Sequence, residues 1–101
     1  MKKIAYLFFV LILILLNSCA SKNPDTNKAE EIAIATQRLG EEYYNAGRYT
    51  IALKTLLEAY KTIPDDPFLN NSLGLVYMAK DRLDLADIHF KKALKIKSDY
   101  S

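Results

Sequence analysis

The sequence has one cysteine, one histidine and no tryptophan in its 101 residues. One cysteine excludes an intramolecular disulfide, and a structural zinc site needs more Cys and His ligands than this composition supplies. A thiol nucleophile needs a base beside it, but His89 lies far along the chain from Cys19, in the middle of a predicted helix. A lone helical histidine is more often a packing or surface residue than a ligand or a base. We therefore predict no metal site, no cofactor and no enzymatic activity.

The sequence also lacks a strong excess of charge. It has 14 Lys and Arg residues against 12 Asp and Glu residues, and Lys2 and Lys3 account for the whole difference. Four lysines cluster between residues 91 and 97, at the end of a predicted helix, where cations complement the helix dipole. We prefer this interpretation to an anion-binding site. Because nucleic-acid binding needs a basic surface to neutralise phosphates, we predict no nucleic-acid partner.

The N-terminus has the pattern of an export signal. Met1 to Lys3 is positively charged, and the thirteen residues from Ile4 to Leu16 are an unbroken apolar run. A membrane-spanning helix needs about 20 apolar residues, whereas a shorter run after a basic start is typical of a signal peptide. Residues 1–18 are therefore predicted to be a signal peptide.

The end of this run, Leu16-Asn17-Ser18-Cys19, resembles a bacterial lipobox. This resemblance implies that Cys19 takes a diacylglycerol and that the chain is cut before it. Two or more acyl chains anchor a protein durably, whereas one holds it only marginally. Two alternatives stay open at this point: Ser18-Cys19-Ala20 also fits an ordinary cleavage site, and the segment could remain uncut as a short anchor. We favour lipidation of Cys19.

The residue after Cys19 bears on location. Ala20 is not the aspartate that retains lipoproteins at the inner membrane of enteric-type bacteria. The resemblance therefore implies a lipid-anchored protein of the bacterial envelope, at the periplasmic face of the outer membrane. Residues 21–27 are polar, with a proline, so residues 19–27 are predicted to be a flexible tether that begins with the lipidated cysteine.

The rest of the chain predicts four helices with short connections. Asn27 with Glu30 forms a capping-box-like start, and Gly47 follows the first helix. Asp66 offers an N-cap, with Pro67 at the first helical position after it. The predicted helices cover residues 28–46, 49–62, 67–80 and 83–97. The sequence therefore predicts an all-α fold.

A period of 34 residues relates the first predicted helix pair to the second. Residues 33–66 and 67–100 align in their glycines, tyrosines, arginines and alanines: Leu39-Gly40 with Leu73-Gly74, Tyr43 with Tyr77, Arg48 with Arg82, Ala52 with Ala86, Leu56 with Phe90, and Ala59 with Ala93. These positions resemble the signature of the tetratricopeptide repeat. The resemblance implies two repeats, residues 28–66 with an N-terminal helix extension and residues 67–101. A glycine inside a helix costs about 1 kcal/mol relative to alanine. Its presence at the same position of both repeats therefore indicates a steric need, and we expect Gly40 and Gly74 to allow the paired helices to approach closely.

The same resemblance implies a protein-binding groove lined by the first helix of each repeat. Carried over position by position, its residues are Ile34, Gln37, Glu41, Tyr44, Asn45, Phe68, Asn71, Leu75 and Met78, with Ala79 beside them. Phe68, Leu75 and Met78 would suit the apolar face of a strand or amphipathic helix. The alternative is that these three residues pack against an adjoining element.

Two repeats are fewer than the three or so that a helical solenoid normally needs, and terminal repeats usually carry a polar capping helix. The last predicted helix has Ile88 and Leu94 on its outer face, and no polar helix follows it in this sequence. Either the chain is a shortened form, or this face meets a partner or another copy. Self-association through the uncapped C-terminal repeat is therefore an expectation.

The lipobox, the polar tether and the two repeats together resemble the pilotin-type lipoproteins of type IV pilus biogenesis. This resemblance implies a protein that helps the pilus secretin reach the outer membrane and assemble. The alternative is a generic repeat lipoprotein that acts as an adaptor for envelope enzymes or for outer-membrane protein assembly.

Overall fold

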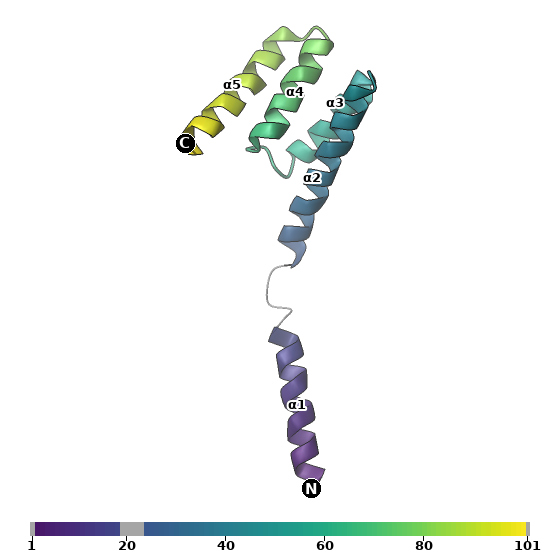
Figure 1. The fold of residues 1–101 in the computed structure, drawn as a ribbon, viewed down its shortest axis with the longest axis vertical. Helices are drawn as coiled ribbons and strands as arrows, with labels where there is room; N and C mark the ends of the chain where they lie inside the picture. Colours follow the sequence, from purple (N-terminus) through teal and green to yellow (C-terminus); the bar gives the residue numbers. More distant parts are fainter. Residues whose placement is uncertain (1, 19–23, 101) are drawn as a thin grey trace.

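A computed structural model describes residues 2–18 and 24–100 of the chain (Figure 1). Within these ranges the structure contains α-helices and no strand, which confirms the predicted all-α fold. The helices are α1 (Lys2–Ser18), α2 (Pro24–Asn45), α3 (Tyr49–Tyr60), α4 (Pro67–Ala79) and α5 (Leu83–Tyr100).

The helix α1 stands apart from the other four (Figure 1). It contains the apolar N-terminal run, and its described side chains, from Lys2 to Leu13, are almost all exposed. It packs against no other helix in the described part of the chain. None of the described helices is long and apolar enough to span a membrane. Cys19, the predicted lipidation residue, lies outside the described residues.

Two predicted helix boundaries were wrong. The helix α2 begins at Pro24, so Asn27 lies in its first turn and is not the N-cap, and residues 24–27 are helical instead of belonging to the tether. Proline suits the first helical position because its φ is already helical and it lacks the N–H that would have no partner there. The helix α5 continues past Lys97 to Tyr100, since no glycine or proline interrupts it. The ends of α3 and α4 lie within two residues of their predicted positions.

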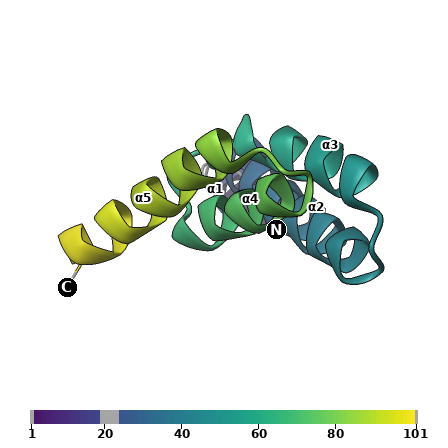
Figure 2. The same ribbon diagram turned by 90° about the horizontal axis from the view of Figure 1, so that it is seen from above.

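The four helices form two antiparallel pairs, α2 with α3 and α4 with α5, joined by packing between α3 and α4. Viewed from above, α2 and α4 lie on one side of the domain and α3 and α5 on the other (Figure 2). Each pair approaches closely at its glycine. A Cβ on Gly40 would lie 2.6 Å from Leu56 Cδ2, and one on Gly74 would lie 2.5 Å from Phe90 Cε1. The predicted steric role of the two glycines is therefore confirmed, and in both pairs the neighbour is the same repeat position.

The turns inside the two pairs also repeat. Gly47 and Asp81, which are 34 residues apart, both have a positive φ, of 78° and 61°. In each turn this residue donates its N–H to the carbonyl three residues back, and the next residue donates to the carbonyl five residues back, as in a Schellman motif. The bonds are Gly47 to Tyr44 (2.9 Å), Arg48 to Tyr43 (2.9 Å), Asp81 to Met78 (3.0 Å) and Arg82 to Tyr77 (2.8 Å). The 34-residue period therefore extends to backbone geometry.

The core lies between α3 and α4. Its fully or almost fully buried members are Ala52, Leu56 and Ala59 of α3 and Leu69, Leu73 and Val76 of α4. The start of α4 is fixed as the sequence predicts, because Asp66 Oδ1 accepts the N–H of Leu69 at 2.8 Å and Pro67 takes the first helical position. This core sets the position of α4, which carries half of the predicted groove.

Candidate partner-binding face

The predicted groove residues form two rows, one on α2 and one on α4. Ile34, Gln37, Glu41 and Tyr44 follow a 3-4-3 spacing, and the same spacing recurs in Phe68, Asn71, Leu75 and Met78. Residues at this spacing share one face of an α-helix. Asn45 follows Tyr44 at the end of α2. We call these nine side chains the groove residues.

A short hydrogen-bonded chain connects the two rows at Glu41. Gln37 Nε2 donates to Glu41 Oε1 at 3.0 Å, and Ser72 Oγ of α4 donates to the same oxygen at 2.9 Å. Gln37 is only 8% exposed, so its side chain orients Glu41 and offers little surface to a partner. Ser72 was not among the groove residues, and the repeat pattern gave no signal for it, since Arg38 occupies the equivalent position of the first repeat.

Four groove residues meet around one hollow. A concavity of about 220 Å³ is lined by Glu41, Tyr44, Asn45, Ser72 and Leu75. Tyr44 is half-buried there, and its ring lies 5.6 Å from the ring of Tyr49 in a tilted arrangement. The hollow therefore combines an apolar wall with a carboxylate and an amide at its edge.

The other groove residues do not reach this hollow. Ile34 lies beside the connection between α3 and α4, at residues 62–66. Phe68 is exposed at the start of α4, with Lys97 Nζ 5.5 Å from the centre of its ring, and Met78 is exposed near the end of that helix. The packing alternative therefore fails for Phe68 and Met78 within the described residues. Ten residues of helix separate them, about 15 Å at 1.5 Å per residue, so the apolar surface is elongated.

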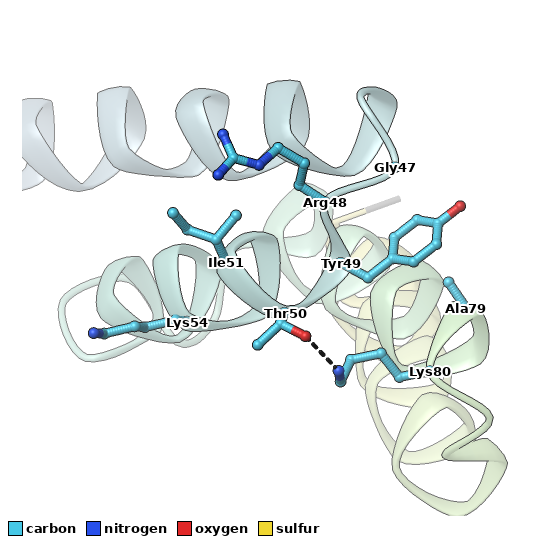
Figure 3. A pocket seen from close by; sticks show the side chains of 8 residues that line it. All are labelled: Gly47, Arg48, Tyr49, Thr50, Ile51, Lys54, Ala79 and Lys80. Carbon is cyan, nitrogen blue, oxygen red and sulfur yellow. Dashed lines mark hydrogen bonds between the residues drawn. The ribbon is translucent and has the colours of Figure 1, made fainter.

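A wider hollow lies outside the groove, between the start of α3 and the end of α4 (Figure 3). Its volume is about 740 Å³, and its lining includes Arg48, Lys54 and Lys80 but none of the groove residues. Lys80 reaches across from the end of α4 and donates to Thr50 Oγ1 at 2.9 Å (Figure 3). This bond fixes the end of α4 against the start of α3.

The single histidine belongs to a polar cluster where the two repeats join. Asn70 is fully buried, and its amide nitrogen donates to the carbonyls of Pro64 at 2.9 Å and Asp66 at 2.8 Å. Both amide hydrogens are then used, so Asn70 Oδ1 is the acceptor that faces His89 Nδ1 at 3.0 Å. His89 must therefore carry its proton on Nδ1. The prediction that His89 is an ordinary packing residue holds in part: it packs, but it also completes a buried network.

Aromatic rings and a lysine surround His89. Its ring stacks on Tyr77 at 5.5 Å and meets Tyr60 edge-on at 5.6 Å. Burial lowers the pKa of His89, and the charge of Lys92 lowers it further. Lys92 Nζ donates to Tyr60 Oη at 2.9 Å and lies 3.5 Å from Asp65, and the bond to Tyr60 is the main cause of the raised pKa of Lys92.

The interpretation of the lysine cluster as a response to the helix dipole was wrong for Lys91 and Lys92. Because α5 runs to Tyr100, both residues lie about two turns before its end. Lys91 pairs instead with Asp87 at 2.8 Å, and Lys92 contacts Tyr60. Lys97 does lie in the last turn.

Comparison with protein families gives one match, between residues 69–100 and the tetratricopeptide repeat. The match covers nearly all of α4 and α5, and α2 with α3 repeats their glycine contacts and turn geometry at the 34-residue offset. Comparison with curated proteins and with solved structures gives no match. Within residues 2–18 and 24–100, no three His, Cys, Asp or Glu side chains gather closely enough to hold a metal ion.

These observations define an all-α protein built from helix pairs of the tetratricopeptide type. Repeats of this type generally mediate contacts between proteins and are generally not catalytic. The repeat therefore suggests a protein–protein interaction scaffold.

Proposed function

We propose that this chain is a lipid-anchored scaffold of a bacterial envelope that binds an extended segment of another protein along the groove residues. The observation that carries the proposal is the hollow at Glu41 and Leu75, which lies where the two rows of groove residues meet. Because α2 and α4 are held together at this point, the face is organised before a partner arrives, which reduces the entropy cost of binding.

The chemistry of the face indicates the kind of segment it accepts. Leu75 lines the hollow, while Phe68 and Met78 extend apolar surface to either side along α4. An amphipathic helix or strand places apolar side chains in such a row. Both hydrogen bonds to Glu41 use Oε1, so Oε2 is left to accept a bond from the partner. We therefore expect a segment with one apolar face and an N–H or ammonium donor beside it.

The anchoring part of the proposal rests on the N-terminal sequence. Leu16-Asn17-Ser18-Cys19 resembles a lipobox, and α1 packs against none of the other described helices. Removal of residues 1–18 would therefore leave the packing of α2 to α5 unchanged. With Ala20 after the modified cysteine, we place the scaffold at the periplasmic face of the outer membrane.

The resemblance to pilotin-type lipoproteins supports a finer proposal, in which the partner is the pilus secretin and the chain assists its localisation or assembly. The alternative within the same scaffold function is an adaptor for envelope enzymes or for outer-membrane protein assembly. The identity of the protein captured at the groove separates the two.

Site-specific photocrosslinking in cells tests the groove. A crosslinking amino acid replaces Met78, which is 46% exposed on the groove face, and in a control it replaces Leu83, which is 60% exposed at the start of α5 and is not a groove residue. We expect a discrete adduct from position 78 that is lost when Leu75→Asp is added. Mass spectrometry then identifies the partner. Equal adducts from both positions, or none from position 78, would contradict binding at the groove.

A further inference from the structure

The two ends of the helix stack expose faces that correspond to the buried contact between α3 and α4. In that contact, α4 contributes Leu69, Leu73 and Val76, and the core that α3 and α4 share is flanked by the half-buried Leu53, Leu57 and Tyr60 of α3. A shift of 34 residues converts the first set into Ala35, Leu39 and Glu42 of α2, and the second into Asp87, Lys91 and Leu94 of α5. Leu73 is 0% exposed, whereas Leu39 is 49% and Leu94 is 69% exposed. The corresponding faces of α2 and α5, the outer helices of the four-helix stack, are therefore exposed.

We propose that a second copy of this chain docks on these faces, with α5 of one copy against α2 of the next. The operation that carries the first helix pair onto the second would then continue from one molecule to its neighbour. Leu94 of one copy would meet the surface between Ile32 and Leu39 of the next, two exposed side chains about two turns apart on α2.

Charge favours this head-to-tail arrangement over a contact between two equal faces. The helix α2 carries five acidic and two basic residues, whereas α5 carries four lysines and three aspartates. Pairing α2 with α5 brings a helix of net charge −3 to one of net charge +1, whereas pairing α2 with α2 opposes two helices of net charge −3. Charge complementarity of this kind selects orientation and partner more than it raises affinity.

The contact is weaker than its internal counterpart. The α3 face has two half-buried leucines, Leu53 and Leu57. The equivalent positions of α5 are occupied by Asp87 and Lys91, which form an exposed ion pair at 2.8 Å. Glu42 likewise stands in α2 where α4 has the buried Val76. These substitutions reduce the apolar area and add charged groups that must be partly desolvated. The association is therefore reversible and sensitive to salt.

The arrangement has a consequence for the groove. A head-to-tail interface is heterologous, so it adds copies in a row instead of closing a symmetric dimer. Because one operation relates α2 to α4 and one copy to the next, the groove residues of successive copies fall on the same side. A row of copies would present a continuous binding face that is longer than one chain provides.

Cysteine crosslinking of the full chain in detergent tests the register. The native thiol is removed by Cys19→Ser, which leaves no other cysteine, and Ala35→Cys and Leu94→Cys are introduced in separate preparations, because Ala35 and Leu94 correspond to Leu69 and Tyr60, which both lie beside the connection between α3 and α4. Mild oxidation should crosslink the mixture and neither preparation alone, and the yield should fall as salt is raised. In the matched control, Ile88→Cys replaces Leu94→Cys. Ile88 is 59% exposed on α5 but corresponds to Lys54, which is nearer the start of α3 and outside the contact, so no crosslink to Ala35→Cys is expected.

Sedimentation of charge-blocked variants gives an independent test. Leu39→Asp blocks the α2 face and Leu94→Asp blocks the α5 face, and both side chains are exposed enough for the fold to survive, which circular dichroism checks. Each variant alone should be monomeric, and the mixture should form a heterodimer that does not grow, since only one intact face remains on each chain. Efficient crosslinking of Leu94→Cys with itself, equal crosslinking of the Ile88→Cys control, or a mixture that stays monomeric would each overturn the head-to-tail contact.

Discussion

Replacement of Gly74 by alanine tests the steric reasoning behind the repeat most directly. An added Cβ would lie 2.5, 2.6 and 2.8 Å from three carbons of the Phe90 ring, well inside the usual contact distance. Overpacking of this kind typically costs about 1–3 kcal/mol, whereas the higher helix propensity of alanine returns about 1 kcal/mol. The clash is the larger effect, so we expect Gly74→Ala to lower the free energy of unfolding by about 1 kcal/mol.

A double-mutant cycle with Phe90→Ala separates the two effects, because Phe90→Ala removes all three clashing carbons. In that background only the propensity of alanine remains, so Gly74→Ala should become stabilising by up to about 1 kcal/mol. The change of sign is the diagnostic result. Urea unfolding followed by circular dichroism measures all four proteins, with an osmolyte present throughout so that the weakest variant stays folded.

The equivalent pair in the first repeat serves as an internal comparison. Gly40→Ala would meet Leu56 Cδ2 at 2.6 Å and the Leu56 backbone nitrogen at 3.3 Å. Leu56 is fully buried, whereas the Phe90 ring is half-buried and can turn toward solvent. Gly40→Ala should therefore destabilise more than Gly74→Ala. If Gly74→Ala costs the same with and without the Phe90 ring, the close approach is not the reason for the glycine.

Further predictions concern the turns, the histidine and the anchor. Gly47→Ala should cost about 1 kcal/mol of stability because the φ of Gly47 is 78°, although an added Cβ would meet nothing within 4 Å. Asp81→Gly should raise the thermal midpoint, because Asp81 also has a positive φ, of 61°. Because the pKa of His89 is lowered from 6.5 in the folded state, the unfolded chain binds the proton first as pH falls. The free energy of unfolding should therefore decrease below about pH 6.5, and His89→Gln should flatten that part of a pH-dependent unfolding profile; an unchanged slope would exclude His89 as its source. A fatty-acid probe should label the wild-type protein, while Cys19→Ser should lose the label and leave the membrane fraction, and an unlabelled wild-type chain would rule out lipidation.

The repeat could be predicted from the sequence because its determinants are local or recur at a fixed spacing. Gly40 and Gly74 identified the close approach of each helix pair, and Asp66 with Pro67 located the start of α4. The outer helices were less predictable. The capping-box pattern at Asn27 was outweighed by Pro24, which begins α2 one turn earlier. Nothing after Lys97 stops α5 before Tyr100, so pattern-based reasoning ended that helix too early.

The candidate site was predicted only in part, for a physical reason. Periodicity tells which residues share a helix face, and Glu41 and Leu75, which it assigns to the faces of two different helices, line the same hollow. The bond between Ser72 and Glu41 depends on the axial offset between α2 and α4, which no single helix encodes. The exposure of Phe68 and Met78 likewise depends on how α4 packs against its neighbours, which its own sequence does not encode.

The polar cluster around His89 explains how this offset is maintained. Only the connection at residues 61–66 joins the two repeats covalently in the described chain, and a short loop alone would let them rotate. Asn70 donates hydrogen bonds to two carbonyls of that connection, and His89 of α5 donates one to Asn70. Lys92 of α5 donates a hydrogen bond to Tyr60 at the end of α3. These hydrogen bonds therefore connect α5, the second helix of the second repeat, to the C-terminal end of the first repeat. Because α2 and α4 are each packed within these repeats, the cluster and the core between α3 and α4 together fix the distance between the two rows of groove residues, and the cluster does so without contributing to their surface.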